Sequence, residues 1–270
     1  KPFPGTEGSA SPFFSPDSQW IGFFAGGKLK KVSIAGGAPQ VLCDSGSNGG
    51  AIWGTDATIV FTPSPGSGLL RVSVAGGKPE VLTTLDHALG EISHRSPEFL
   101  PGGKVLLFTA QTGPGWDESH IEVLRLDTGE RRVILRGGET GRFVPTGHLV
   151  YHRAGALLSV PFDLDRLEVT SNAPVTIAED VSRPMGSILG GQYSFSSLGS
   201  LAYVPASSHQ YERRLVWVDR KGEVEPLPAP PRAYNNQALS PDGRQVAVGI
   251  LAGGFELWIF DLTRGTLTRL

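Results

Sequence analysis

The residues of this sequence best suited to chemistry stand in one polar stretch, "DHALGEISHRSPEF" (residues 86–99). It carries Glu91, His94 and Arg95, and so combines a carboxylate, an imidazole and a guanidinium. A guanidinium presents a planar fork of donors that suits a carboxylate or a phosphate, and the other two groups can move protons. The stretch therefore predicts either a functional site or local hydrogen bonding within a loop.

Metal binding is the next chemistry to consider, because the chain has six histidines: His87, His94, His120, His148, His152 and His209. Only His148 and His152 stand four residues apart, and they flank the strand-like stretch "LVY" instead of lying on a helix as in a local zinc motif. The single cysteine, Cys43, excludes an internal disulfide and a cysteine-rich metal site, and its neighbours "PQVLCD" favour a buried, inert thiol. We therefore predict no metal and no cofactor, although ligands from distant parts of the chain would escape this search.

An internal repeat indicates which elements position these residues. "SPFFSPDSQWIGFFAGG" near the start and "QALSPDGRQVAVGILAGG" near the end share a Ser-Pro-Asp turn followed by alternating apolar residues. Similar turn-and-strand units occur six times along the chain, at a spacing of roughly 40 to 50 residues. That period is typical of one four-stranded blade of a propeller.

The six units predict an all-β fold, a six-bladed β-propeller of four-stranded antiparallel blades, with 1–270 as a single domain. The expected blades are 9–43, 44–84, 85–137, 138–181, 182–229 and 230–270, and residues 1–8 are expected to be an extra strand from a preceding or clasping segment. That extra segment and the abrupt end at "TLTRL" lead us to expect a piece of a longer protein. A β-sandwich is the alternative, but it does not explain the regular period.

Composition and charge narrow the partners. Among 270 residues, 24 are basic and 26 are acidic, which does not favour binding to nucleic acid or to a membrane surface. No apolar run approaches the roughly 18 residues needed to cross a bilayer, so we expect no membrane insertion by this segment. The 36 glycines and 21 prolines interrupt any helical period and favour short strands joined by turns.

Two sets of motifs carry a family resemblance. The turn "SPDG", followed by "LWIFDLTRGTLTRL", resembles the Pro-Asp propeller repeats of TolB-like proteins, which also occur in prolyl oligopeptidases. The stretches "SPFFSPDSQWIGFFAGGKLKKVSIAGG" and "PTGHLVYHRAGALLSVPFDL" resemble the C-terminal propeller of bacterial serine/threonine protein kinases. The resemblance covers about residues 9–270 and implies a WD-like ring in a membrane-anchored bacterial protein, with a periplasmic location as the expectation and a cytoplasmic one as the alternative. The chain itself has no kinase motif and no Gly-x-Ser-x-Gly.

The channel mouth is where a propeller most often binds, because the loops before the innermost strands open onto it. The equivalent positions are Ser11, Trp53, His94, Arg142, Gln192 and Asn236. This set has few acids and suits a polar or anionic ligand better than a divalent cation. We predict a ligand-binding site made of Glu91, His94, Arg95, Arg142, Gln192 and Asn236. The alternative is that Arg95 and Arg142 only pair with acids such as Glu98 and Glu139.

A second candidate surface is the insertion "GPGWDESH" (residues 113–120), which interrupts the third unit between two strands. Its Trp116 either belongs to an exposed recognition loop or packs onto its own blade. The sequence does not decide between these two positions.

Three functions remain open on the sequence alone. The main expectation is a non-catalytic propeller, without catalytic residues, that binds a small polar or anionic ligand or a protein partner as the sensor or docking part of a larger bacterial protein. The alternative is a propeller hydrolase or lyase with its site, metal-assisted or not, in the central channel. The third possible function is that of a purely structural assembly module. The residues do not identify the ligand.

Overall fold

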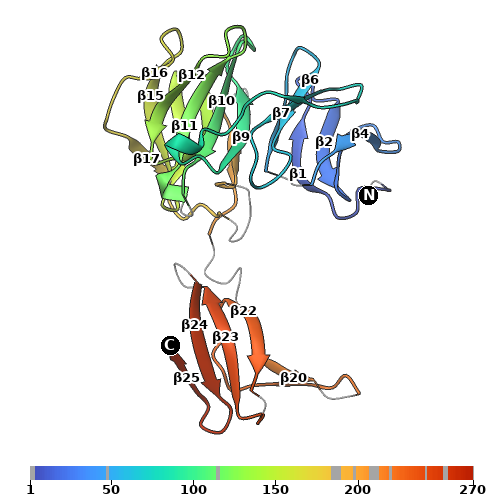
Figure 1. Cartoon of the computed structure of the whole chain (residues 1–270), viewed down its shortest axis with the longest axis vertical. Coiled ribbons are helices and arrows are strands. Elements are labelled where there is room, and N and C mark those ends of the chain that lie inside the picture. The colour runs from blue at the N-terminus through green and yellow to red at the C-terminus, as the bar shows by residue number, and fades with distance from the viewer. Residues whose placement is uncertain are drawn as a thin grey trace. The chain divides into compact units, whose positions relative to one another are not determined.

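The computed structural model describes residues 4–46, 49–113, 116–183, 190–196, 199–206, 213–218, 221–240, 242–251 and 255–269. They fall into two compact units, Lys1–Pro205 and Ala206–Leu270, which we describe separately. The described residues form strands and two short 3-10 helices, η1 (His87–Leu89) and η2 (Trp116–Glu118), with no α-helix among them (Figure 1). None of their helices is long and apolar enough to cross a membrane. The predicted all-β class is confirmed.

The first unit holds four antiparallel sheets of at least four strands. The first contains β1 (Ala10–Phe14), β2 (Trp20–Ala25), β3 (Lys28–Ser33) and β4 (Gln40–Asp44). The second contains β5 (Ala51–Trp53), β6 (Thr58–Phe61), β7 (Leu70–Ser73) and β8 (Glu80–Val81). The third contains β9 (Ser93–Phe99), β10 (Val105–Gln111), β11 (His120–Arg125) and β12 (Arg131–Arg136). In each of them the strands pair in chain order, as in a propeller blade.

The fourth sheet has five strands because two short strands share one neighbour. It contains β13 (Glu139–Val144), β14 (His148–Arg153), β15 (Ala156–Asp163), β16 (Glu168–Val169) and β17 (Val175–Ala178). Both β16 and β17 pair with β15, at different points along it. A two-stranded sheet of β18 (Tyr193–Phe195) and β19 (Leu201–Tyr203) follows in the same unit.

The first strands of the four large sheets lie next to one another. Contacts join β1 to β5, β5 to β9 and β9 to β13. Each of these strands forms one edge of its own sheet, so the sheets radiate from an axis that the first strands line. We call the space along this axis the channel of the first unit.

Both faces of a sheet are buried because its neighbours pack on either side. On β6, Ile59 and Phe61 pack toward Phe24 and Leu29 of the first sheet, whereas Val60 packs in the cluster of the third sheet. The two sides follow from strand geometry, since successive side chains point to opposite faces. Further along, Leu107 and Ile121 meet Leu149 and Tyr151 between the third and fourth sheets.

The second unit is a smaller assembly with its own core. It contains a hairpin of β20 (Val216–Val218) and β21 (Val224–Pro226) and a sheet of β22 (Tyr234–Leu239), β23 (Gln245–Leu251), β24 (Phe255–Asp261) and β25 (Thr266–Arg269). Its core is formed by Val246, Val248, Ile250 and Phe260, with Tyr234 beside them. With the sheets of the first unit, the described strands form seven sheets.

The two Ser-Pro-Asp turns are built by the same hydrogen bonds, one in each unit. Ser15 Oγ donates to Asp17 Oδ1 over 2.5 Å and accepts from the N–H of Trp20 over 2.9 Å. Ser240 Oγ likewise donates to Asp242 Oδ1 over 2.6 Å and accepts from the N–H of Gln245 over 2.9 Å. The equivalence inferred from the sequence therefore holds at the level of individual atoms.

Two further expectations meet the structure at the N-terminal end. Residues 4–8 form turns instead of the expected strand, with the N–H of Ser9 donating to the carbonyl of Thr6, and residues 1–3 lie outside the described part. Cys43 is buried as expected, and burial raises the pKa of its thiol to about 11. His209 also lies outside the described residues.

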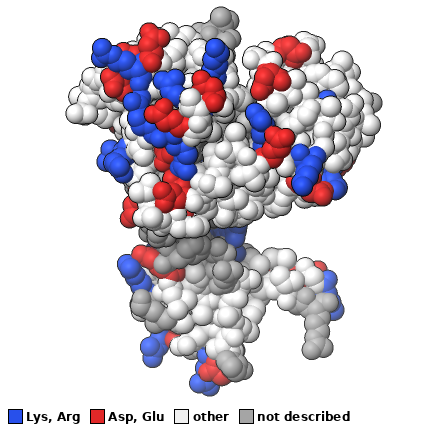
Figure 2. Space-filling model, turned by 45° about the horizontal axis from the view of Figure 1, so that its top comes forward, with Lys and Arg blue, Asp and Glu red and all other residues white. Residues whose placement is uncertain are grey.

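Charged side chains of both signs are interspersed on the face of the first unit in Figure 2. On that face no broad field of one sign develops of the kind that steers a polyanion.

Gly68 tests the close packing of the second sheet. A Cβ there would collide with the backbone carbonyl of Thr83, whereas a Cβ at Gly66 would meet nothing within 4 Å. We expect Gly68→Ala to lower the free energy of unfolding of the first unit by about 1–3 kcal/mol, since the backbone must shift. Gly66→Ala should change it by less than about 0.5 kcal/mol. Urea unfolding measures both, and equal effects would contradict the packing described.

Candidate functional site

Three inner strands share a local distortion at the channel. Ser11 in β1, Ser96 in β9 and Thr140 in β13 have φ angles of 49°, 51° and 54°. Each lies where the pairing of its strand with the next one shifts register. A left-handed residue inside a strand is uncommon and marks a bulge, which bends the strand and re-aims the side chains that follow.

A short sequence pattern accompanies the distortion. It reads Ser or Thr, then Pro or Gly, any residue, and Phe: "SPFF" (11–14), "SPEF" (96–99) and "TGRF" (140–143). The third position holds Glu98 in β9 and Arg142 in β13. Both charged side chains of the site thus come from one equivalent position in adjacent sheets. A search for turns and alternation overlooks this pattern, although it is present in the sequence.

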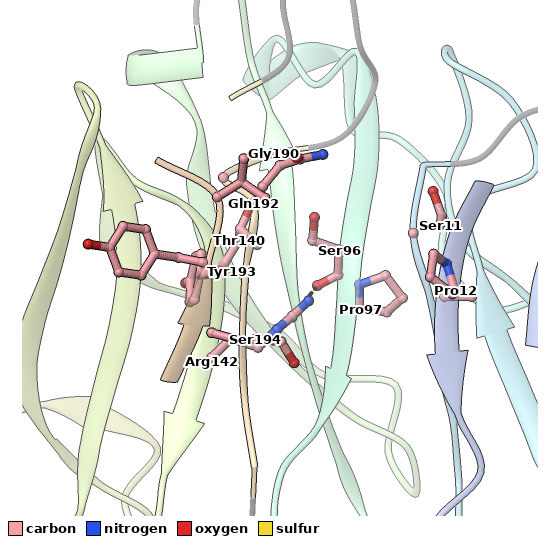
Figure 3. A pocket seen from close by; sticks show the side chains of 16 residues that line it. Ser11, Pro12, Ser96, Pro97, Thr140, Arg142, Gly190, Gln192, Tyr193 and Ser194 are labelled. Carbon is pink, nitrogen blue, oxygen red and sulfur yellow. Dashed lines mark hydrogen bonds between the residues drawn. The ribbon is translucent and has the colours of Figure 1, made fainter. Parts of the chain in front are cut away.

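A cavity of about 420 Å³, here named the channel pocket, opens beside the bulged residues. Its lining includes Ser11, Pro12, Gly50, Ala51, Ser96, Pro97, Thr140, Arg142, Gln192 and Tyr193, all from the first unit. Figure 3 shows Ser11 and Pro12 on one side, Ser96 in the middle and Tyr193 on the other side. In the described part of the lining, serine and threonine hydroxyl groups and backbone atoms therefore surround one cationic side chain, that of Arg142.

Arg142 forms an ion pair with Glu98. Its Nε lies 2.9 Å from Glu98 Oε2, and the N–H of Phe143 donates to Oε1 over 3.0 Å. The two side chains are only 24% and 17% exposed. Burial raises the pKa of Glu98 above its ordinary range, and the neighbouring Arg142 lowers it only in part. Glu98 is therefore a stronger base than an exposed glutamate.

Backbone carbonyls hold the guanidinium in place. Nη1 of Arg142 donates to the carbonyl of Ser96 over 3.3 Å (Figure 3). It also donates to the carbonyl of its neighbour Gly141 over 3.1 Å. Among the residues that the structure describes, Nη2 has no hydrogen-bond partner. Its two N–H groups can bind an oxygen atom of a ligand without breaking an existing bond.

A second, larger cavity continues from the first. It measures about 800 Å³ and shares Pro12, Ala51, Arg142, Tyr193 and Ser194 with the channel pocket. The rest of its lining includes Glu98 and the aromatic side chains Phe13, Phe14, Phe99, Phe143 and Phe195. We name it the aromatic chamber. The Arg142–Glu98 pair lies at the junction of the two cavities.

The structure does not bring Glu91 and His94 to the channel pocket, which corrects that part of the predicted site. His94 Nε2 lies 2.8 Å from Glu91 Oε2, and its Nδ1 lies 2.7 Å from Thr83 Oγ1. Arg131 contacts Glu91 at 2.5 Å and Glu122 at 2.9 Å. Strand alternation turns His94 toward the second sheet, so a polar stretch resembling a site forms an internal network.

Burial governs the protonation of His94. The side chain is fully buried, and burial lowers the pKa of His94 to about 4, although Glu91 opposes the shift. His94 is therefore neutral near pH 7 and carries no charge for an anionic ligand.

Arg95 and Trp116 meet outside the channel pocket. Their guanidinium and indole ring are 5.0 Å apart, and Arg183 lies over the same ring at 5.7 Å. Burial lowers the pKa of Arg95 to about 10, while the nearby Glu139 opposes this. Trp116 is half-buried between two arginines, so it packs down instead of standing exposed at a loop tip.

The remaining two predicted ligand-binding residues, Gln192 and Asn236, belong to different units of the chain. Gln192 lines the channel pocket (Figure 3). Asn236 belongs to β22 in the second unit, and its side chain lies outside the described residues. The pairing of Arg142 with Glu98, which on the sequence alone was the alternative to ligand binding, is present.

Comparison with known proteins addresses the fold. No protein-family model and no curated protein matches the chain. Regucalcin from Agrobacterium tumefaciens, described as a calcium-binding protein, matches with a TM-score of 0.55 and 15% identity over 89% of this chain and 81% of its own. XC5397 from Xanthomonas campestris, described as a gluconolactonase, matches with a TM-score of 0.55 and 15% identity over 97% and 86%. The chain folds as a β-propeller.

TolB from Acinetobacter baumannii also matches, with 19% identity over 97% of this chain and 63% of its own. Its TM-score is 0.46. All these identities are low, so the likeness concerns the architecture of the propeller.

The main functional expectation from the sequence needs correction. A non-catalytic binding propeller was expected, yet regucalcin and XC5397, which each match with a TM-score of 0.55, are described as a calcium-binding protein and a gluconolactonase. The alternative, a hydrolase or lyase with its site in the channel, fits these findings better.

The described residues contain no cluster of carboxylates of the kind that usually binds calcium. Calcium takes six to eight oxygen ligands, usually with several carboxylates. No group of three His, Cys, Asp or Glu side chains in the described ranges is placed to hold an ion. Glu98, the carboxylate of the aromatic chamber, is already paired with Arg142.

His94 gives the internal network a measurable pH dependence. Its folded pKa of about 4 lies below the unfolded value of 6.5, so the unfolded chain takes up the proton first as the pH falls. Stability is then lost between about pH 6.5 and 4, by about 3 kcal/mol from this residue. We expect His94→Gln to flatten that part of the profile, measured by urea unfolding. His148→Gln should keep the wild-type slope, and a wild-type slope in His94→Gln would contradict the buried neutral state.

Proposed function

We propose that this propeller is a hydrolase of carboxylic esters, with lactones as the first candidates, and that it acts where the channel pocket meets the aromatic chamber. The observation that carries the proposal is the Glu98–Arg142 pair. The carboxylate of Glu98 is poorly solvated, has a raised pKa and lies 2.9 Å from the guanidinium of Arg142. Backbone carbonyls hold that guanidinium in place, and its Nη2 still has N–H groups to donate. General-base catalysis is most efficient when the pKa of the base lies near the working pH, and for a carboxylate that requires a raised pKa.

The geometry supports a two-step reaction. Glu98 takes a proton from a water molecule, and the resulting hydroxide attacks the ester carbonyl carbon. The carbonyl oxygen becomes an oxyanion, which the free N–H groups on Nη2 of Arg142 stabilise. When the tetrahedral intermediate collapses, the bond from the acyl carbon to the alcohol oxygen breaks. The departing alkoxide takes the proton from Glu98, which leaves an acid, an alcohol and the original carboxylate.

Lactones are the first candidates for two reasons. One of the propellers with the same fold, XC5397, is described as a gluconolactonase, so the fold accommodates this chemistry in another protein. Hydrolysis of a lactone opens its ring, so the acid and the alcohol that form remain in one molecule. A molecule of that kind fits a pocket of about 420 Å³. In this proposal the polar or anionic ligand expected at the channel mouth is the carboxylate product.

We also infer that the chain forms one ring of six blades across residues 1–270, with the Pro-Asp repeat of TolB-like propellers. The matching bonds of Ser15 and Ser240 support a repeat that runs from the first blade to the last. By its resemblance to kinase-linked propellers, the ring belongs on the periplasmic side of a membrane-anchored bacterial protein. Protease protection in spheroplasts tests that location, and protection of the propeller would contradict it.

Substitution of Glu98 tests the catalytic role. We expect Glu98→Gln to lower kcat for δ-gluconolactone or p-nitrophenyl acetate by at least about 100-fold, because the amide cannot take a proton. In the wild type, kcat/KM should rise with pH through the raised pKa of Glu98, since only the ionised form is a base. Hydrolysis is followed with a pH indicator or by nitrophenolate absorbance.

The control is Glu130→Gln, which removes an exposed carboxylate in the turn after β11. It should leave kcat and the pH profile unchanged. Equal activity in Glu98→Gln and the wild type, or no hydrolysis of any ester by the wild type, would overturn the proposed function.

A further inference from the structure

The inner strands divide the channel into a polar half and an aromatic half. At their bulges they place Ser11, Ser96 and Thr140 on the channel pocket. Three residues later they place Phe14, Phe99 and Phe143 on the aromatic chamber. Because the division follows one sequence pattern in three sheets, it is a consistent property of the channel.

Part of the aromatic lining is not needed for the hydrophobic core. The Phe14 side chain is 60% exposed and belongs to none of the core clusters among the described residues. An aromatic side chain left in contact with solvent in a cavity of about 800 Å³ is suited to bind an apolar ligand. The reactive pair Glu98–Arg142 lies at the polar end of that cavity.

We propose that the substrate is amphipathic: its ester group lies at Glu98 and Arg142, and its apolar acyl chain occupies the aromatic chamber. This inference rests on the proposed function, because it takes the ion pair as the reacting point. Arg142 borders both cavities, so a carbonyl held by its Nη2 can direct a chain past Glu98 and toward Phe14 and Phe99. A small polar sugar lactone would leave the chamber unused.

The apolar arm should make binding depend on chain length. Each buried CH₂ group strengthens binding by up to about four-fold, equivalent to about 0.8 kcal/mol. The carboxylate of a fatty acid is the product of the proposed reaction, and its headgroup suits Arg142. Straight-chain carboxylates therefore test the chamber without requiring catalysis.

Isothermal titration calorimetry with butyrate, hexanoate and octanoate measures this directly. We expect the Kd of the wild type to fall at least ten-fold from butyrate to octanoate. Phe14→Ser should weaken octanoate binding at least three-fold and leave butyrate unchanged. The matched control is Leu89→Ser, which removes a 64% exposed apolar side chain of η1 and should change neither.

Catalysis provides an independent arm. The value of kcat/KM should be higher for p-nitrophenyl octanoate than for p-nitrophenyl butyrate, in line with the tighter binding of octanoate. Equal Kd values for all chain lengths, or equal effects of Phe14→Ser and Leu89→Ser, would overturn the amphipathic substrate. If esters are hydrolysed without a preference for chain length, this inference fails and the proposed function stands. If carboxylates bind by length but no ester is hydrolysed, the chamber stands and the proposed function fails.

Discussion

The left-handed residue in the inner strands is the constraint on which the channel depends. Ser96 and Thr140 occupy a backbone region that costs a non-glycine residue of the order of 1–3 kcal/mol, so their surroundings must hold them there. The neighbouring sheets supply the necessary bonds. The N–H of Ser96 donates to the carbonyl of Gly49 over 3.2 Å, and the N–H of Thr140 donates to Thr109 Oγ1 over 2.8 Å. Packing of one sheet against the next thus fixes the direction of the charged side chains.

The chemical consequence is an ion pair in a poorly solvated place. Glu98 and Arg142 occupy the same position of adjacent bulged strands, and this equivalence brings opposite charges within 2.9 Å of each other. Burial destabilises the charged form of a carboxyl group and therefore raises its proton affinity. The pKa of Glu98 is raised for this reason, although a guanidinium lies beside it. A single backbone feature therefore links the fold, the shape of the cavity and the basicity of its carboxylate.

The sequence was informative about the repeat and less so about the site. The Ser-Pro-Asp turns at Ser15 and Ser240 could be predicted because their residue types fix the local hydrogen bonds. Glu91 and His94 were misplaced because a polar stretch does not show which face of a strand each side chain takes. From the sequence, Glu98 was considered only as an acid that could pair with Arg142. Its environment depends on contacts between sheets and on the φ angle of Ser96, and neither can be read from the residue types.

The central claim is that Glu98 is a partly buried base held beside Arg142. Its most direct test is a pH titration of the Glu98 carboxyl carbon by ¹³C NMR in labelled protein, assigned by comparison with Glu98→Gln. A midpoint above the ordinary glutamate value of about 4.5 is predicted, because burial outweighs the attraction of Arg142. A midpoint at or below that value would mean that the carboxylate is well solvated or fully neutralised, and would contradict the account.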